Sequence, residues 1–304
     1  MTEDSILERL RGRVTIPRGS GVVAGIGDDC AIFRPRGSTE DLLFTTDLLI
    51  EGVHFARATH SPAMVGHKAL ARGLSDIAAM GGDPMFCLVS LALAAWADRR
   101  WVDRFYTGLL QLARATGTVI AGGDLAHAEC FTCDIVVAGS VPRGRALRRG
   151  SARPGDAVYV SGRLGGSALG LEKRRGPGWK RHRRPEPRLA LGRYLRETLG
   201  ATAAMDLSDG LSLDLRRLAL ASGVSAEIDP PPVFPGATIE QALHGGEDYE
   251  LLFTVPRATR VPRRFDKLPL TRIGVAGRGP AGCVLLSGRP LPALGYDHFR
   301  SPSP

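Results

Sequence analysis

LFTTDLLIEGVHF, residues 43–55, begins as an apolar run of β-preferring residues, which is typical of a buried strand. We expect this strand to stop at Asp47 and the chain to turn through Gly52 to His54. An acid at the end of a buried strand lies at a sheet edge, where ligand sites are common. Taken alone, the stretch fits a strand that ends in a solvated loop equally well, so the rest of the chain decides between the two.

Composition indicates a globular protein with room for two hydrophobic cores. The chain has 304 residues, of which 43% are hydrophobic and 23% charged. No basic-then-apolar leader is visible, and the longest apolar run, residues 85–97, is too short to cross a bilayer. We therefore expect a cytoplasmic protein without a membrane partner. The pair Cys130 and Cys133 forms a CxxC, but no second CxxC completes a zinc site.

The net charge of +9 is concentrated in residues 173–184, where Lys and Arg cluster around Gly176, Pro177 and Gly178. We interpret this segment as a solvated loop. Nucleic-acid binding would require aromatic platforms or a recognition helix nearby, and neither is visible, so we expect no nucleic-acid partner.

Hydrophobic periodicity predicts an alternation of strands and helices in both halves. Ser61 and Pro62 are typical of a helix start, and that helix should run to about Met80. The further expected helices are residues 2–11, one capped by Asp98, 187–199 and one from Gly210; the expected strands include 85–93, 133–141, 157–160 and 226–229. Residues 143–154 are basic and lack periodicity, which predicts a boundary between domains at 1–142 and 143–304.

Acidic residues follow apolar or glycine-rich segments at five places: Asp28/Asp29, Asp47, Asp76, Asp124 and Asp206/Asp209. Converged carboxylates repel one another, and hard oxygen ligands without a His or Cys cluster favour Mg²⁺ over zinc. Mg²⁺ held by carboxylates commonly shares its remaining positions with phosphate, so the pattern favours phosphoryl transfer. Convergence is an assumption at this point. For Asp209 alone, capping of the helix that starts at Gly210 explains the residue equally well.

Six segments, GIGDDCAIF, TTDLLIEGVHF, LSDIAAMG, GGD, MDLSDGL and GGEDYELLFT, occur in this order between Gly25 and Thr254. Together they resemble the thiamine-monophosphate kinase family, which belongs to the superfamily of aminoimidazole ribonucleotide synthetase. The resemblance implies a two-domain α/β fold: an N-terminal mixed sheet with helices that forms a homodimer, and a sandwich-like C-terminal domain. It further implies ATP-dependent conversion of thiamine monophosphate to thiamine diphosphate with Mg²⁺.

The resemblance also implies roles for individual residues. It assigns His54, Glu247 and Tyr296 to thiamine monophosphate, and Gly123, Arg149 and Ser208 to ATP. Its expected metal ligands are Asp29, Thr45, Thr46, Asp47, Asp76, Asp124, Asp206 and Asp209. Departures from the family pattern are Gly73, Leu125 and His244, where Asn, Thr and Ser are usual, and a short segment between Asp229 and Gln241.

The favoured mechanism is direct in-line transfer assisted by metal, without a catalytic base, because a phosphate oxygen is already ionised at neutral pH. One alternative is another ATP-dependent enzyme of the superfamily, such as a ligase or a selenophosphate synthetase relative. A second alternative, a non-catalytic anion- or nucleic-acid-binding protein, depends only on the basic residues 173–184 and leaves the acidic groups unexplained.

Overall fold

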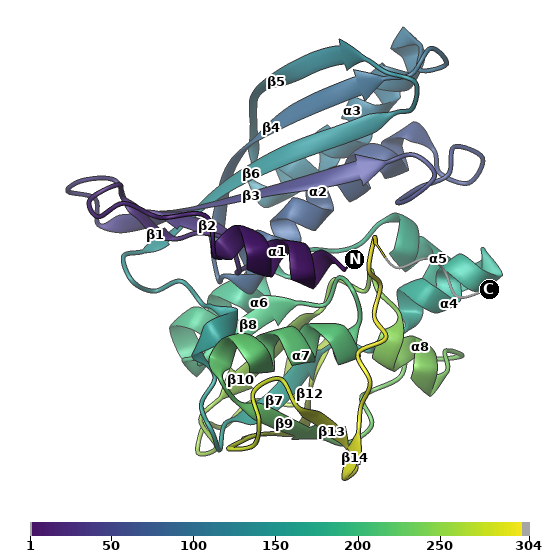
Figure 1. The fold of residues 1–304 in the computed structure, drawn as a ribbon. Helices are drawn as coiled ribbons and strands as arrows, with labels where there is room; N and C mark the ends of the chain where they lie inside the picture. Colours follow the sequence, from purple (N-terminus) through teal and green to yellow (C-terminus); the bar gives the residue numbers. More distant parts are fainter. Residues whose placement is uncertain (1, 300–304) are drawn as a thin grey trace.

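Two β-sheets with helices packed against them make up residues 2–299, the part of the chain that the computed structural model describes (Figure 1). The first sheet has the order β1-β2-β3-β6-β4-β5. Only β4 and β5 run parallel in it. Its strands are β1 (Val22–Ala24), β2 (Ala31–Phe33), β3 (Glu40–Ile50), β4 (Asp83–Leu93), β5 (Val119–His127) and β6 (Thr132–Pro142).

The second sheet has the order β14-β13-β9-β12-β7-β10-β8, with β11 paired to β12. Its strands are β7 (Ala157–Ser161), β8 (Ala203–Asp206), β9 (Ser225–Ile228), β10 (Leu251–Val255), β11 (Arg264–Phe265), β12 (Leu268–Gly277), β13 (Val284–Leu286) and β14 (Arg289–Pro290). The helices are α1 (Glu3–Arg11), α2 (Pro62–Ala79), α3 (Arg99–Thr116), α4 (Gly166–Lys173), α5 (Gly176–Arg183), α6 (Leu189–Tyr194), α7 (Leu211–Ser222) and α8 (Ile239–His244), with short turns η1 (Arg149–Ser151) and η2 (Leu195–Leu199). The mixed α/β fold with two sheets confirms the predicted fold class.

The strand expected to stop at Asp47 continues to Ile50. All eleven residues of β3 pair with β6, with Asp47 opposite Ile135. Because β6 supplies a hydrogen-bonding partner along the whole strand, one polar side chain does not end it. Asp124 likewise lies inside β5, which continues to His127. The prediction that these two acids stand at strand ends is therefore wrong.

Helix α2 joins the two halves. Ser61 caps it, as predicted, by accepting the N–H of Met64. Its apolar side chains pack against β3, β6 and α3, and its last turn contacts α6 and β8 of the second half. A Cβ at Gly192 of α6 would lie only 2.0 Å from the carbonyl oxygen of Ala78, so glycine is required where the two backbones meet. This contact fixes the end of α2 against the second sheet.

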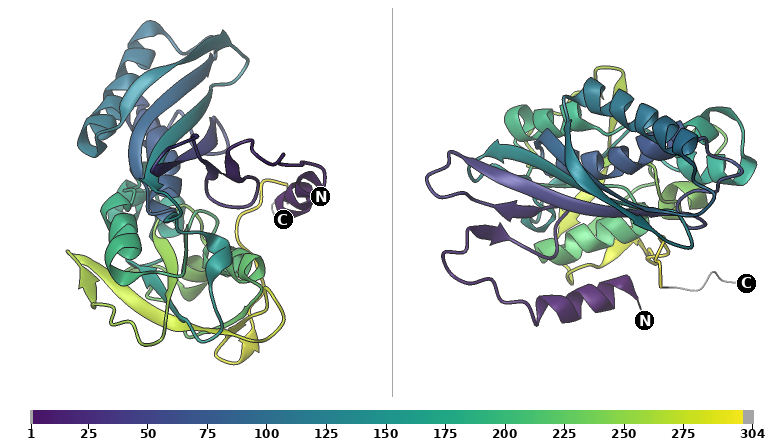
Figure 2. Two further views of the ribbon diagram at one scale, coloured as in Figure 1. Left: turned by 90° about the vertical axis from the view of Figure 1, so that its left-hand side faces the viewer. Right: turned by 90° about the horizontal axis from the view of Figure 1, so that it is seen from above.

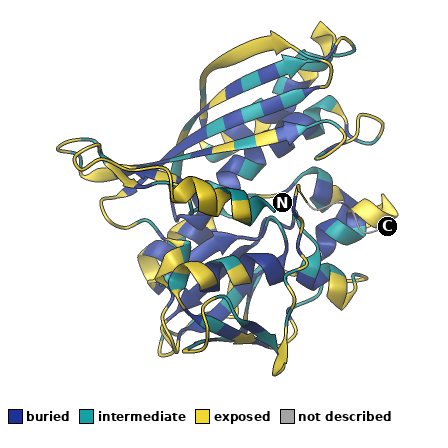
Figure 3. Cartoon of the chain, viewed as in Figure 1, coloured by how far each residue is buried: buried dark blue, intermediate teal, exposed yellow. Residues whose placement is uncertain are grey.

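Helices cover the two sheets differently. In the second sheet, α7 packs on one face through Leu211, Leu215 and Leu218, and α6 with η2 packs on the other through Leu191 and Leu195. In the first sheet, α2 and α3 lie on one face, and the opposite face carries no helix (Figures 1 and 2). Strand β5, at the edge of this sheet, is exposed along most of its length (Figure 3).

The basic segment is helical, and the prediction of a solvated loop is wrong. Residues 176–183 form α5, in which Trp179 and His182 are buried. Arg181 reaches inward to Glu250 at 2.7 Å, where the carboxylate is fully buried. The amphipathic spacing of Trp179 and His182 outweighs Gly176 and Pro177, since Pro is tolerated in the first turn of a helix. The charge of Arg181 therefore neutralises acids of the protein itself.

The two ends of the described chain meet beside the junction of the halves (Figure 2). The backbone N–H of Glu3 donates to Asp297, and Arg217 of α7 pairs with Asp4 at 3.0 Å. No helix between residues 2 and 299 combines the length and the apolar character that a bilayer crossing needs.

Candidate active site

A cavity of about 970 Å³ lies between the two halves of the chain. Its walls come from β3, α2, the loop after β8, the loop before β10 and the C-terminal tail, and include Asp47, Asp76, Ser208, Glu247 and Tyr296. The volume is within the range of about 300–1,000 Å³ that ligand pockets span. Segments far apart in the sequence therefore meet around one space.

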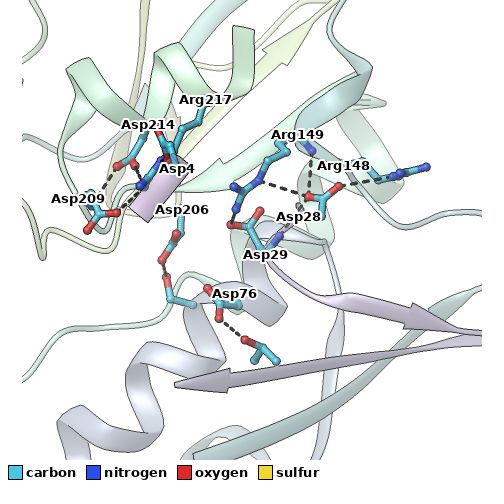
Figure 4. Close-up of polar contacts among 12 residues, drawn as sticks. Asp4, Asp28, Asp29, Asp76, Arg148, Arg149, Asp206, Asp209, Asp214 and Arg217 are labelled. Carbon is cyan, nitrogen blue, oxygen red and sulfur yellow. Dashed lines mark hydrogen bonds and ion pairs between the residues drawn. The ribbon is translucent and has the colours of Figure 1, made fainter. Parts of the chain in front are cut away.

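Three of the expected metal ligands converge: one carboxylate oxygen from each of Asp29, Asp76 and Asp206 lies within 4.8 Å of the other two (Figure 4). Asp29 follows β1, Asp76 lies near the end of α2, and Asp206 is the last residue of β8. Two hydroxyls orient them, because Thr45 donates to Asp76 at 2.5 Å and Ser75 donates to Asp206 at 2.7 Å. We refer to these three aspartates as the acidic cluster.

The acidic cluster is held at an electrostatic cost. Burial and the neighbouring carboxylates raise the pKa of Asp29 to about 7 and the pKa of Asp76 well above its ordinary value. Burial likewise raises the pKa of Asp206 to about 6. The Oδ2 atom of Asp29 is buried and has no hydrogen-bond partner in the described chain. Buried carboxylate oxygens, one of them unpaired, fit a hard divalent cation such as Mg²⁺.

Asp47 and Asp209 line the same cavity, and each is paired with an arginine. An Nη atom of Arg72 lies 2.5 Å from Asp47, and one of Arg217 lies 2.5 Å from Asp209. Burial raises the pKa of Asp47 to about 6 although Arg72 opposes the shift. In the acidic cluster only Asp29 has such a pair, with Arg149 at 2.6 Å, among the salt bridges of the described residues.

Asp214, and not Asp209, holds the start of α7. Its carboxylate accepts the backbone N–H of Asp209 at 3.1 Å and that of Gly210 at 3.0 Å. It reaches back over the first turn in the manner of the acid in a capping box. The alternative role that the sequence suggested for Asp209, capping this helix, is therefore wrong.

Thr46, Gly123 and Asp124 lie apart from the acidic cluster. The Thr46 hydroxyl is on the helix-free face of the first sheet and donates to Asp134 at 2.6 Å. Asp124 is exposed on β5, which is three strands from β3, or about 14 Å at the usual strand spacing. A Cβ at Gly123 would lie 1.8 Å from the carbonyl oxygen of Val89, so the close approach that this glycine permits is to the neighbouring strand.

His54, Glu247 and Tyr296 all line the cavity. Burial lowers the pKa of His54 to about 3, so its ring is neutral. Its Nδ1 atom accepts the N–H of Ile50 at 3.0 Å, which places the ring proton on Nε2. Tyr296 is half exposed, and its backbone N–H donates to the backbone carbonyl oxygen of Asp209.

Two basic residues that sequence reasoning missed hold Glu247. Lys68, fully buried on α2, lies 2.7 Å from one carboxylate oxygen, and His182 lies 3.2 Å from the other. Burial alone would raise the pKa of Glu247, but Lys68 and His182 outweigh it and lower the pKa to about 2. Glu247 has a positive φ of 63°, an unusual conformation that often marks functional sites. An ionised acceptor is therefore fixed in the cavity wall.

A signal in the sequence could have revealed two cations, Lys68 and Arg72. Lys68, Arg72 and Asp76 follow one another at intervals of four residues on the helix predicted from Ser61. Residues at this spacing share one helix face, so a charged stripe crosses a largely apolar helix. Both cations line up with Asp76 toward the cavity.

Two of the residues expected to contact ATP lie close to the site. Arg149 lies beside the acidic cluster, and Ser208 lines the cavity. Arg149 donates to Asp29 at 2.6 Å. Its Nε atom is buried without a hydrogen-bond partner among the described residues. The carbonyl oxygen of Ser208 accepts the N–H of Glu247 at 2.7 Å.

Comparison with known proteins decides the family. Residues 27–141 match the AIR synthase related protein, N-terminal domain, and residues 153–284 match the AIR synthase related protein, C-terminal domain. The chain is 38% identical to the thiamine-monophosphate kinase of Escherichia coli strain K12, with 99% of each chain covered. The chain belongs to the thiamine-monophosphate kinase family. The resemblance found in the sequence is thus confirmed.

Two further similar proteins support the same family. The Bacillus subtilis strain 168 member is 35% identical, with 92% of this chain and 95% of the relative covered. The solved structure of AaThiL complexed with AMPPCP and TMP superposes with a TM-score of 0.86 at 33% identity, covering 98% of this chain and 97% of that one.

The backbone N–H groups of the glycine-rich turn at residues 162–167 are taken up by an acid of the protein itself. Asp248 occupies the start of α4, where its carboxylate accepts the N–H of Gly165 at 2.5 Å and that of Ser167 at 3.0 Å. Helix N-termini attract anions, and here the anion is the protein's own.

The raised pKa values of Asp29 and Asp206 predict how pH changes stability. Between the unfolded value near 3.8 and the folded values of about 6 to 7, the folded state binds more protons than the unfolded state. The free energy of unfolding without metal therefore falls as pH rises through this window. We expect Mg²⁺ to raise the melting temperature more at about pH 8 than at about pH 6, because it replaces those protons. Thermal melts with Mg²⁺ and with EDTA measure this; an equal rise at both pH values would contradict the assignment.

Proposed function

We propose that this chain transfers the γ-phosphoryl group of ATP to the phosphate of thiamine monophosphate, giving thiamine diphosphate and ADP. The observation that carries the proposal is the acidic cluster: Asp29, Asp76 and Asp206 meet beside a cavity whose wall also holds Glu247. The arrangement belongs to a member of the thiamine-monophosphate kinase family, in which one relative is described with AMPPCP and TMP bound.

Mg²⁺ would be held by the acidic cluster, with Thr45 and Asp47 beside it and Asp209 as a further ligand. When bound, Mg²⁺ would neutralise the charge of two anionic substrates and of the group in transfer. Thr45 and Ser75 fix the carboxylates of Asp76 and Asp206 before any ligand arrives. Such preorganisation lowers the cost of reorganisation during the reaction.

Thiamine monophosphate would bind along the Glu247 side of the cavity. The ionised carboxylate of Glu247 accepts a hydrogen bond from the amino group of the aminopyrimidine. Tyr296 offers an aromatic face to the cationic thiazolium ring. His54 donates its Nε2 proton toward the phosphate end. Lys68 keeps Glu247 charged and also donates to the carbonyl oxygen of His54 at 2.9 Å, which couples the two contacts.

ATP would place its phosphates near Arg149 and Ser208. The guanidinium fork of Arg149 matches phosphate geometry, and its Nε, which lies 3.7 Å from Asp28 and makes no hydrogen bond to the described residues, would serve for that contact. Transfer would be direct and in line. It would need no general base, because the acceptor oxygen is already ionised. Leu125 follows Gly123 and Asp124 where the family pattern has a hydroxyl, which we expect to affect affinity and rate more than reaction class.

The functional unit would be a homodimer formed through the helix-free face of the first sheet. Leu48 and Leu88 on this face remain 52% and 37% exposed, and Leu125 on the adjacent edge strand is 66% exposed. Thr46 and Asp124 point to the same face. A second copy packed there would cover the apolar side chains and bring its Gly123 and Asp124 toward Thr46 of the first copy, next to Asp47 in the chain. Asp124 would thus serve the site of the partner.

Residues 1–142 would form the ATP- and Mg²⁺-binding, dimerising domain, and residues 143–304 would complete the substrate site. A cytoplasmic location fits the five cysteines, all of which are free thiols.

The deciding experiment incubates the purified chain with ATP, Mg²⁺ and thiamine monophosphate and measures thiamine diphosphate by chromatography. We expect equal amounts of ADP and thiamine diphosphate, and loss of both in EDTA. Consumption of ATP without thiamine diphosphate would reject the kinase and favour another ATP-dependent activity of the superfamily.

A further inference from the structure

Arg72 is a buried cation in the cavity wall that neither the sequence pattern nor the family resemblance assigns to a role. It lies on α2 one turn before Asp76, and its side chain is only 12% exposed. One Nη atom contacts Asp47 at 2.5 Å, and the other donates to the carbonyl oxygen of Leu48 at 2.8 Å. The pair of contacts fixes the plane of the guanidinium group.

The Nε atom of Arg72 takes no part in these contacts. It is buried and has no hydrogen-bond partner among residues 2–299. Leaving a buried donor unpaired is costly, and the cost is larger for a charged group. The Nε2 atom of His54, which carries the ring proton, is a second buried donor without a partner in the same cavity wall. Both residues line one cavity, and two unpaired N–H groups in one cavity wall are the complement of an anion.

The position of Arg72 identifies the kind of anion. The acids that act on it are Asp47 and Asp76, on the metal side, and Glu247, on the substrate side. The acids would keep Arg72 charged even though burial alone disfavours the charge. A guanidinium between the proposed Mg²⁺ ligands and the proposed thiamine contacts stands where the phosphoryl group in transfer has to pass.

We propose that Arg72 is a phosphoryl-binding residue of this active site, which donates its free Nε–H to a non-bridging oxygen while its Nη atoms keep Asp47 in place. This inference rests on the proposed function. It assigns to Arg72 the stabilisation of charge that a fixed arginine gives in other phosphoryl transfers. The oxygen belongs either to the phosphate of thiamine monophosphate or to the γ-phosphate of ATP.

The test uses two substitutions. Arg72→Met keeps the length of the side chain and removes every donor. Arg72→Lys keeps the charge and the contact with Asp47 but lacks the planar fork, so it guards against loss of folding through an unpaired Asp47. The matched control is Arg34→Met, because Arg34 also pairs with a buried aspartate, Asp41, at 2.6 Å but lies outside the cavity wall.

Binding and turnover are measured separately. Calorimetry gives the affinity for thiamine monophosphate in EDTA and for the non-hydrolysable analogue AMPPCP with Mg²⁺. We expect Arg72→Met to weaken one of the two by about tenfold or more and to lower kcat by about 10² or more. Arg72→Lys should melt near the wild-type temperature and still lose about tenfold in kcat. Arg34→Met should keep both affinities and kcat.

The weakened arm identifies the phosphate: loss for thiamine monophosphate assigns Arg72 to the acceptor, and loss for AMPPCP assigns it to the donor. Unchanged affinity in both arms, or a rise in kcat with Arg72→Met, would overturn the proposal, since Arg72 would then only balance Asp47. If the wild-type chain forms no thiamine diphosphate, the proposed function fails by itself, and the two binding arms still test Arg72.

Discussion

Asp206→Asn is expected to lower kcat for thiamine diphosphate formation by at least about 10² to 10³, the loss seen when one fixed electrostatic contact to a transition state is removed. The amide keeps the volume of the side chain and can still accept the hydroxyl of Ser75, but it cannot supply a charged metal ligand. Because burial raises the pKa of Asp206 to about 6, removing its charge should not lower the melting temperature in EDTA.

Asp41→Asn is the matched control, because Asp41 is also a buried aspartate but belongs neither to the acidic cluster nor to the cavity wall. Its pKa is lowered by the hydrogen bond from Arg34, so its charge stabilises the fold. We expect Asp41→Asn to lower the melting temperature and to keep kcat, the opposite of Asp206→Asn. Near-native turnover of Asp206→Asn at saturating Mg²⁺ and ATP would show that the acidic cluster is not the metal site.

Asp124→Ala should also inactivate the protein, although its carboxylate lies three strands away from β3 in the same chain. The reason is that Asp124 would complete the site of the partner subunit. Complementation tests this directly. Asp124→Ala and Asp206→Asn subunits are co-expressed with different affinity tags, and the heterodimer is isolated through both tags.

If Asp124 serves the partner's site, one of the two sites in that heterodimer contains both native acids, because the Asp124→Ala subunit keeps its own Asp206 and would receive Asp124 from its partner. We expect about half of the wild-type activity in the heterodimer and almost none in either mutant homodimer. Action of Asp124 within its own chain would leave both sites of the heterodimer damaged and inactive. Full activity of the Asp124→Ala homodimer would instead remove Asp124 from the site.

Local sequence patterns predicted most elements of this fold. Ser61 and Pro62 mark the start of α2, and Asp98 caps α3 by accepting the N–H of Trp101, because both signals act through neighbouring residues. Patterns that depend on distant partners were misread. Asp47 interrupts an apolar run, yet β6 keeps the strand going to Ile50.

The basic residues 173–184 show the same limit. Their charge predicts solvent exposure, but Arg181 is neutralised by Asp248 and Glu250, which lie more than sixty residues further along the chain. No local signal reports such a partner. Only the spacing of Trp179 and His182 indicates a buried helix face.

Some residues of the site could likewise be predicted from the sequence, and others could not. The acids were recognisable because carboxylates after apolar segments are unusual, and Asp29, Asp76 and Asp206 do come together. Lys68 and Arg72 were missed because a basic residue on a helix is ordinarily solvated. Their burial follows from the junction between α2 and the second half, which the sequence of α2 does not contain.

The most direct test of the central claim is the location of the metal. Crystals grown with Mn²⁺, which replaces Mg²⁺ at oxygen sites, and with AMPPCP allow the ions to be found by anomalous scattering. We expect a peak among the carboxylates of Asp29, Asp76 and Asp206, in contact with the phosphates of the analogue. Phosphates bound elsewhere in the molecule, with no anomalous peak at these three aspartates, would contradict the claim.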